Sequence, residues 1–303
     1  MSYQRVETQA VFDACCSISK QDIPQVEGVI DLVLLMLEEL WPDIVENLVD
    51  IAVGRLGGVP EPLDSEEDSE AVEDFVLALV GALELRLGLV LPLEGQEIIL
   101  AAVERLLLAG GVSIGAAVGL GAATAAGLPQ LGLGDLEFSL RGRVQLRRQE
   151  IGDLIGEALT SAEPAGELIG DRLRQLLGIQ TKMWLPFVVD QWAYRWFNVG
   201  TFEGAQQKGI KALVAFNNPP RGPDGKTTPF CFWVHKRAIS IGRVRAQLDV
   251  FERAVRNNNI RLAIRAWPLL TTTDGSPTDF ANFFLSSGLP PYHGRCRTVA
   301  RPV

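Results

Sequence analysis

Apolar side chains recur at helical spacing through most of the N-terminal part of the chain. Between residues 25 and 55 the repeat predicts two helices, because Pro42 interrupts it and proline suits the first turn of a following helix. The same spacing predicts further helices at about 70–89, 95–108, 148–160 and 163–177. A long aromatic helix is then expected from Lys182 to Gly209, with an apolar side formed by Trp184, Phe187, Val188, Trp192, Trp196 and Phe197.

The pattern changes in the last third of the chain, where short runs typical of strands alternate with helical runs. Strands are expected at about 211–217, 260–266 and 296–301, and helices at about 242–257 and from the capping residue Ser276 to Leu285. Alternating apolar positions between Asp135 and Leu146 predict a hairpin or strand-like arm. Together these elements predict an α+β fold that is predominantly α. A helical region, 1–180, is followed by a small mixed α+β domain with a short sheet, 181–303.

Residues 106–134 form a segment that is crowded with glycine and alanine and carries no charge. Gly111, Gly115 and Gly119 within it are spaced by four, which lets helices approach closely. The segment is long enough to span a bilayer, but glycine and alanine contribute little transfer energy and Pro129 interrupts its end. We therefore expect a buried or inter-subunit helix, and insertion into a membrane after a conformational change is the alternative.

Charge is distributed unevenly along the chain, whose formal net charge is −9. The residues from Ala205 onward contain fifteen Lys/Arg and five Asp/Glu, so the acidic excess lies before them. Part of that excess is in an acidic linker, 59–70, which has no apolar periodicity and is expected to be a solvated loop. A basic domain favours nucleic acid or an acidic protein surface as its partner. Alternatively, the two regions neutralise each other across an internal interface.

Composition excludes several classes of protein. A hydrophobic fraction of 47% excludes a disordered chain, and four cysteines in 303 residues do not make a disulfide scaffold. The N-terminus is polar and lacks the features of a secretory signal, so we expect synthesis in a reducing cytoplasm. The sequence contains no P-loop, no complete G-x-G-x-x-G and no H-E-x-x-H motif.

Two short motifs in the basic part of the chain are the clearest candidates for chemistry. Cys231-x3-His235 and His293-x2-Cys296 contain both histidines of the chain. Cys2His2 is a common tetrahedral zinc set with ligand pairs at such spacings, so a structural zinc site is one interpretation. A thiol or disulfide contact between Cys231 and Cys296 is the second, and unrelated packed residues are the third. Catalytic zinc is disfavoured, because neither motif has an adjacent Asp or Glu to act as general base.

The same motifs carry a resemblance to a known family. The segment DGKTTPFC, Asp224–Cys231, resembles the D-x-x-T-C-x-x-C turn of phage Mu F-like head morphogenesis proteins, also called minor capsid proteins. The segment PPYHGRCRT, Pro290–Thr298, resembles the P-P-x-H-x-x-C-R-C ending of that family. A long helix carrying Asn198 precedes them in the family's order, and the resemblance covers about residues 185–303.

The chain departs from the family motifs at two cysteine positions. Thr228 stands at the first and Thr298 at the last, which leaves Cys231 in one motif and Cys296 in the other. If the family's missing pair forms a bond or shares a metal, this chain lacks that link and His235 is the residue available to replace it.

The resemblance implies a virion protein, present in few copies at or near the portal inside the capsid, and in the host cytoplasm during assembly. Its implied partners are the portal protein, capsid or scaffold components, and viral DNA. The apolar helices of residues 1–180 are expected to carry attachment to the portal or capsid, or self-association. Its implied role is to assist head assembly, DNA packaging or DNA ejection, without enzymatic activity. No cofactor is expected, unless the Cys2His2 set holds a structural zinc. Six arginines of the basic domain are expected to contact DNA phosphates independently of sequence, because no base-reading motif accompanies them: Arg243, Arg245, Arg253, Arg256, Arg261 and Arg265.

Two alternatives come from other classes of function. One is a membrane-active ejection protein that uses residues 106–134. The other is a serine hydrolase, because Gly111–Gly115 matches the G-x-S-x-G nucleophile elbow with Ser113 at its centre. The residues before this match are helical in pattern, whereas the elbow follows a buried strand, so a non-enzymatic protein is the preferred interpretation.

Overall fold

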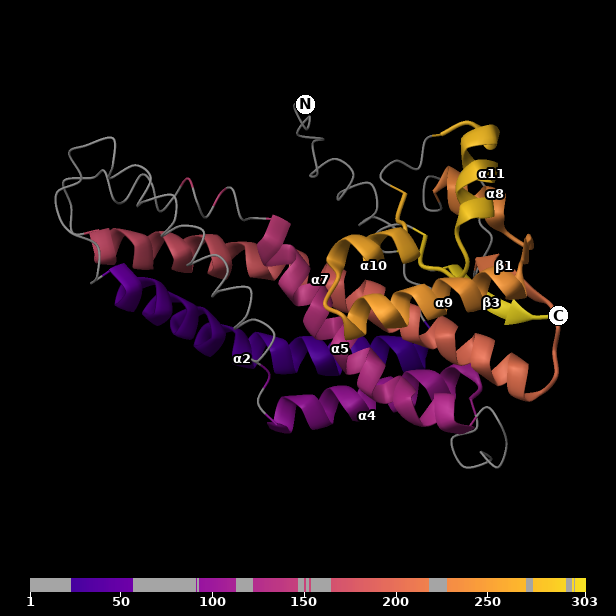
Figure 1. Ribbon diagram of the computed structural model, residues 1–303, viewed down its shortest axis with the longest axis horizontal. Helices are drawn as coiled ribbons and strands as arrows, with labels where there is room; N and C mark the ends of the chain where they lie inside the picture. Colours follow the sequence, from indigo (N-terminus) through magenta and orange to yellow (C-terminus); the bar gives the residue numbers. More distant parts are fainter. Residues whose placement is uncertain are drawn as a thin grey trace. The chain divides into compact units, whose positions relative to one another are not determined.

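The structure is a computed structural model that describes residues 23–56, 91, 93–112, 122–146, 150, 153, 165–217, 228–270, 275–292, 296 and 298–303. Within these residues the fold is predominantly helical with a small antiparallel sheet, which confirms the predicted α+β fold (Figure 1). The predicted linker at 59–70 and the predicted helix at 70–89 lie outside the described residues.

Long helices come first in the described part of the chain: α2 (Pro24–Leu56), α4 (Leu93–Gly110), α5 (Ala122–Leu146) and α7 (Ala165–Gln207). Shorter elements follow: β1 (Leu213–Asn217), α8 (Pro229–Val234), β2 (Ala238–Ile239), α9 (Ile241–Arg256), α10 (Ile260–Ala266), α11 (Pro277–Ser286) and β3 (Thr298–Pro302). The predicted helices at 95–108, at 242–257 and after Ser276 are confirmed by α4, α9 and α11.

The described residues fall into two compact units. Unit 1 draws them from Met1–Leu32, Ile98–Asp135 and Val189–Val303, and therefore contains the sheet and the shorter helices. Unit 2 draws them from Val33–Glu97 and Leu136–Val188.

The sheet belongs to unit 1 and has the strand order β2-β1-β3, with β1 antiparallel to both neighbours. Val214 pairs with Ala238 on one side, and Ala215 pairs with Ala300 on the other. The strands predicted at 211–217 and 296–301 are thereby confirmed as β1 and β3. The backbone N–H of Ala300 donates to Oδ1 of Asn198, a fully buried side chain of α7, at 2.6 Å. This bond satisfies a buried strand N–H and holds β3 against α7.

Glycines allow the backbones of α4 and α7 to approach closely within unit 1. A Cβ on Gly200 would lie 2.7 Å from the backbone oxygen of Leu107, and one on Gly204 would lie 2.5 Å from the carbonyl carbon of Gly111. Side chains cannot occupy either position without moving the helices apart. The close approach depends on Gly200 and Gly204, which lie outside the predicted pattern of glycines, whereas a Cβ on Gly111 would meet only Nζ of Lys208, at 3.8 Å. Gly115 and Gly119 of the predicted pattern lie outside the described residues.

A buried ion pair joins α5 to α7 in unit 1. Nη1 of Arg195 donates to Asp135 at 2.6 Å, and the indole of Trp196 donates to the second carboxylate oxygen at 2.9 Å. The guanidinium carbon of Arg195 lies 5.0 Å from the ring centroids of both Phe251 and Trp267. One side chain thus links α5 and α7 to α9 and to the end of α10.

Unit 2 is held by apolar packing along α2 and α7. The indole rings of Trp41 and Trp184 meet edge to face, with centroids 5.2 Å apart. At the surface, Nε of Arg174 donates to Glu46 at 2.9 Å. Both side chains of that pair are about half exposed, so solvent screens it and the packing contributes most of the stability.

The prediction that Pro42 separates two helices is wrong. The proline lies inside α2, which is continuous from Pro24 to Leu56. A proline inside a helix costs about 3 kcal/mol, but the buried side chains of Leu37, Trp41 and Val45 flank it on one stripe. Their burial offsets the cost, because an apolar side chain contributes about 1.5–3 kcal/mol when fully buried. In the same way α7 joins two predicted helices and includes Pro186.

Two strand predictions are also wrong. Residues 260–266 form α10, because the side chain of Asn259 accepts a hydrogen bond from the backbone N–H of Leu262 at 3.0 Å and caps a helix. Residues from Asp135 to Leu146 belong to α5. Leu136, Phe138 and Leu140 are all buried there, so the apparent period of two came from a helix buried on more than one side.

Candidate functional site

The two cysteines of the predicted clasp lie together in unit 1. Sγ of Cys231 on α8 is 3.8 Å from Sγ of Cys296, just before β3, and both side chains are buried. A disulfide bond measures about 2.05 Å, so the sulfurs are in contact without being bonded. The hydroxyl of Thr298 donates to Sγ of Cys231 at 3.3 Å. Segments 65 residues apart in sequence therefore converge at one point.

The two threonines that stand at cysteine positions of the motifs compared above, Thr228 and Thr298, help to build this site. Thr228 caps α8, its hydroxyl accepting from the backbone N–H of Cys231 at 3.2 Å, and Pro229 follows at the start of the helix. Thr298 is placed by its pairing with Asn217 in the sheet. The cap thus orients one cysteine, and the sheet brings a hydroxyl to its sulfur.

Buried aromatic rings lie near the cysteines: Phe230 precedes Cys231 in sequence, and Tyr292 is close enough to both cysteines to be affected by their charge. The ring of Tyr292 is fully buried and lies 5.5 Å from that of Phe230, centroid to centroid, while its hydroxyl donates to Gly288 at 3.2 Å. Burial, with a smaller effect from Cys296 and Cys231, raises the pKa of Tyr292 well above its ordinary value. The site is therefore dry and apolar, which suits packing or a bond between sulfurs better than acid–base chemistry.

The described residues do not complete the predicted four-residue metal set. His293 lies outside them, and among those described no group of three or more His, Cys, Asp or Glu side chains is arranged to hold a metal ion. His235 ends α8, and its ring lies 4.8 Å from that of Phe216. Burial lowers the pKa of His235, and the charges of Lys236 and Arg301 lower it further, so the imidazole is favoured in its neutral form.

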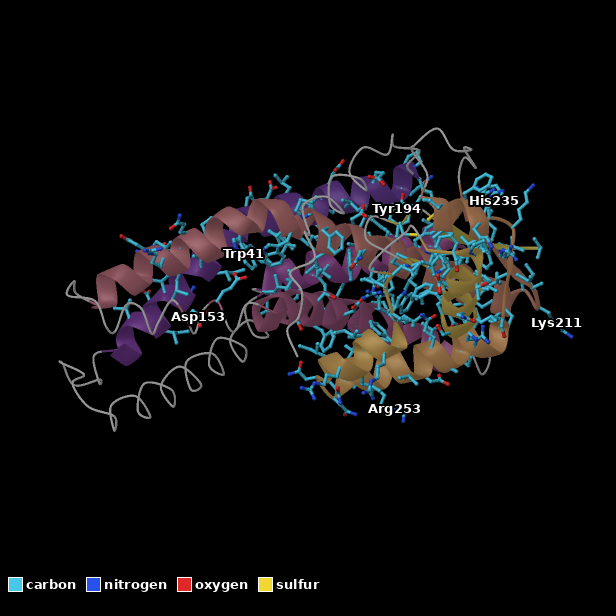
Figure 2. All side chains as sticks on the ribbon, turned by 90° about the horizontal axis from the view of Figure 1, so that it is seen from above. Trp41, Asp153, Tyr194, Lys211, His235 and Arg253 are labelled. Carbon is cyan, nitrogen blue, oxygen red and sulfur yellow. The ribbon has the colours of Figure 1, made fainter. Side chains whose placement is uncertain are left out.

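The six arginines proposed for phosphate contact divide into three groups. Arg245 donates to Glu203 at 3.2 Å, and Arg256 forms an ion pair with Glu252 at 2.7 Å. Arg243 is half-buried. The others are exposed, on α9 or α10, and are Arg253, Arg261 and Arg265. Figure 2 shows Arg253 on the outer side of α9.

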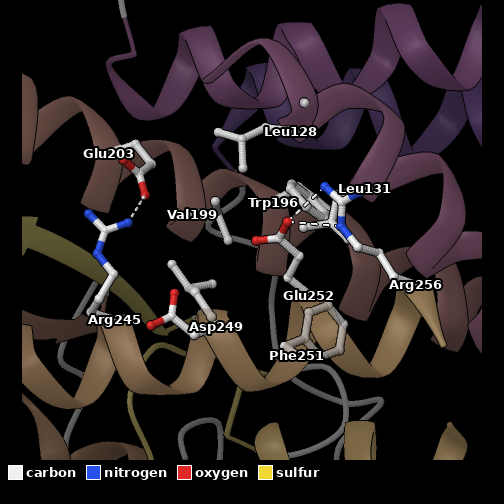
Figure 3. Close-up of a pocket in the computed structure, with 12 residues that line it drawn as sticks. Leu128, Leu131, Trp196, Val199, Glu203, Arg245, Asp249, Phe251, Glu252 and Arg256 are labelled. Atoms are coloured by element: carbon white, nitrogen blue, oxygen red, sulfur yellow. Dashed lines mark hydrogen bonds and ion pairs between the residues drawn. The ribbon is translucent and has the colours of Figure 1, made fainter. Parts of the chain in front are cut away.

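The two paired arginines line a small cleft between α9 and the helices α5 and α7 of unit 1 (Figure 3). Its volume is about 160 Å³, and its walls include Leu128, Trp196, Glu203, Asp249 and the two ion pairs. Burial raises the pKa of Glu203, and the charge of Asp249 adds to this, while Arg245 opposes it. The cleft is smaller than the roughly 300 Å³ of ordinary ligand pockets, so it is suited to water or a small ion.

Sequence reasoning missed the carboxylates of this cleft and the buried pair of Asp135 and Arg195. One signal was available for the exposed pair, because Glu252 and Arg256 are four apart on a predicted helix. Asp135 is the first charge after the uncharged segment, which marked it without revealing its partner.

The alternative functions rest on residues 106–134, which are only partly described. The described portions lie in α4, in Gly111 and Val112, and in α5, and Ser113, Gly115 and Gly119 are outside them. Of the helices in the described ranges, none combines the length and the apolar character needed to cross a membrane.

Comparison of the chain with protein-family models, with curated proteins and with solved structures found no match.

Proposed function

We propose that this chain is a non-enzymatic phage head protein of the Mu F-like type, located at or near the portal inside the capsid. In this role it contacts the portal or capsid components and binds packaged DNA without sequence preference. Its place in the host cytoplasm is limited to assembly, before it is enclosed in the head.

The observation that carries the DNA part of this proposal is the exposed arginine face, which we define as Arg253, Arg261 and Arg265. These side chains lie on α9 and α10 and take part in none of the ion pairs found in the described part of the chain. Arg261 and Arg265 are four residues apart on one helix, so both project to the same side. Exposed guanidinium groups without a base-reading element favour contact with phosphates.

The arrangement of the two motif segments supports the family part of the proposal. Cys231 and Cys296 belong to different segments, and their Sγ atoms lie 3.8 Å apart, while the hydroxyl of Thr298 donates a hydrogen bond to Sγ of Cys231. A shared turn and ending that pack together are expected if both segments descend from one domain type. The dry surroundings of the cysteines favour a structural role for them.

Duplex DNA binding as a function of salt tests the proposal. Three phosphate contacts give a slope of about −2.7 in log K against log salt concentration, since each contact contributes about −0.9. Arg253→Gln or Arg265→Gln should each flatten the slope by about 0.9. Arg172→Gln, an exposed arginine of α7 in unit 2, is the matched control and should leave it unchanged. Binding that is absent, or that ignores salt, refutes the DNA contact.

A further inference from the structure

A second basic surface lies on the sheet of unit 1, formed by Phe216, His235, Lys236 and Arg301. The guanidinium carbon of Arg301 on β3 lies 3.9 Å from the ring centroid of Phe216 on β1. The His235 ring lies 4.8 Å from the same phenyl ring at an interplanar angle of 51°. Three planar groups thus occur next to one another. We call these four residues the cation–aromatic surface.

This surface is accessible and positively charged. Lys236 and Arg301 are exposed, and Phe216 and His235 are partly exposed. The imidazole of His235 lies near two cations, Lys236 and Arg301. Their charges attract an anion, and the planar His235 ring lies beside the Phe216 ring.

The same combination is repeated on the adjoining residues of α8 and the turn after it. The guanidinium carbon of Arg237 lies 3.7 Å from the centroid of the Trp233 indole, and its Nε donates to the Trp233 backbone oxygen at 2.8 Å. Phe232, between these residues and Cys231, is 54% exposed. A second pairing of a guanidinium group with an aromatic ring therefore occurs on residues that adjoin His235 and Lys236 in sequence.

We propose that the cation–aromatic surface binds single-stranded nucleic acid. Such strands offer unstacked bases that pile onto aromatic rings or guanidinium planes, and a phosphate backbone that is attracted by neighbouring cations. A duplex hides its base faces, and an acidic peptide uses only the charge. The adjacent planar groups of Arg301, Phe216 and His235 match the single strand, because they offer both a cation for phosphate and rings for a base. This surface is separate from the arginine face on α9 and α10, and the inference goes beyond duplex binding.

The test uses the full chain and a labelled oligothymidine of about 15 nucleotides, with a duplex of equal length for comparison. Phe216→Leu keeps the apolar volume and removes the aromatic face, and it should weaken oligothymidine binding about 5-fold to 150-fold. Arg301→Lys keeps the charge and removes the guanidinium plane, so binding should weaken while the salt slope stays the same. Arg301→Gln should also flatten that slope by about 0.7.

Three results would overturn the inference. One is oligothymidine binding that Phe216→Leu and Arg301→Lys leave unchanged. Another is a chain that binds the duplex alone. A third is displacement of the oligothymidine by polyglutamate at equal charge concentration, which would mean that the surface selects charge only. Arg253→Gln separates this test from the test of the proposed function. It should weaken duplex binding, and in its background Phe216→Leu should still weaken oligothymidine binding by the same factor.

Discussion

Replacing Asp135 by asparagine removes the carboxylate that faces a buried guanidinium. The Asp135 side chain is fully buried and that of Arg195 is 9% exposed, with 2.6 Å between the bonded atoms. Breaking a buried pair on one side leaves an uncompensated charge, and the cost is about 3–5 kcal/mol of unfolding free energy. Glu252→Gln is the matched control. Its partner Arg256 is mostly exposed, so the cost should be about 0–1 kcal/mol.

The assay is urea denaturation followed by circular dichroism and by tryptophan fluorescence, comparing midpoints and slopes. A second variant, Asp135→Asn combined with Arg195→Met, isolates the unpaired charge. Methionine keeps an apolar contact with Phe251 and Trp267, and replacing a buried pair by apolar groups is often neutral or stabilising. The double variant should therefore be more stable than Asp135→Asn alone. If it is not, or if Asp135→Asn costs no more than Glu252→Gln, the buried charge is not what holds these helices.

Further predictions concern the helix contact, the cleft and the cysteines. Gly204→Ala should lower the free energy of unfolding by about 1–3 kcal/mol or more, because the added Cβ would meet backbone atoms. In the same denaturation assay Gly28→Ala should stabilise the protein, because its Cβ would meet no atom within 4 Å and alanine favours a helix over glycine. A raised pKa for Glu203 means that the folded state holds this proton more tightly than the unfolded chain does. Stability should fall as pH rises from the ordinary value of 4.5 through the folded pKa, and thermal melts of Glu203→Gln should show a smaller fall. Treatment with a disulfide-forming reagent should join Cys231 to Cys296 and lower the number of titratable thiols by two, and Cys296→Ser should abolish this loss. Metal that stays bound in the presence of a chelator would support a zinc site instead.

Elements with strong local signals were predictable from sequence. α11 begins at Pro277, directly after its N-cap Ser276, whose hydroxyl and backbone N–H form a capping box with Asp279, so these three residues define its start. The strands β1 and β3 carry the apolar runs expected of a small sheet. At 260–266 the isoleucines favour a strand, but these residues form helix α10 because Asn259 caps its N-terminus.

Features that depend on distant residues were not predictable from periodicity. The burial of Leu37 and Trp41 keeps α2 continuous through Pro42, and no local pattern encodes that packing. Asp135 and Arg195 are 60 residues apart, and only the folded chain shows that they meet.

The candidate site was predictable in part. The short spacings within the motifs and their order led to the hypothesis that Cys231 and Cys296 are in contact, and the structure places their sulfurs 3.8 Å apart. The pairing of Arg245 with Glu203 was not predictable, since it joins α9 to α7 across 42 residues. A charged residue counted as available for phosphate can thus be engaged by the protein itself.

Mass spectrometry of gradient-purified phage particles tests the central claim most directly. If the chain is a head protein at the portal, it should be found in particles from the phage that carries its gene, in few copies relative to the major capsid protein, and should resist removal by protease added to intact heads. Detection in the infected-cell lysate together with absence from purified particles would contradict the account.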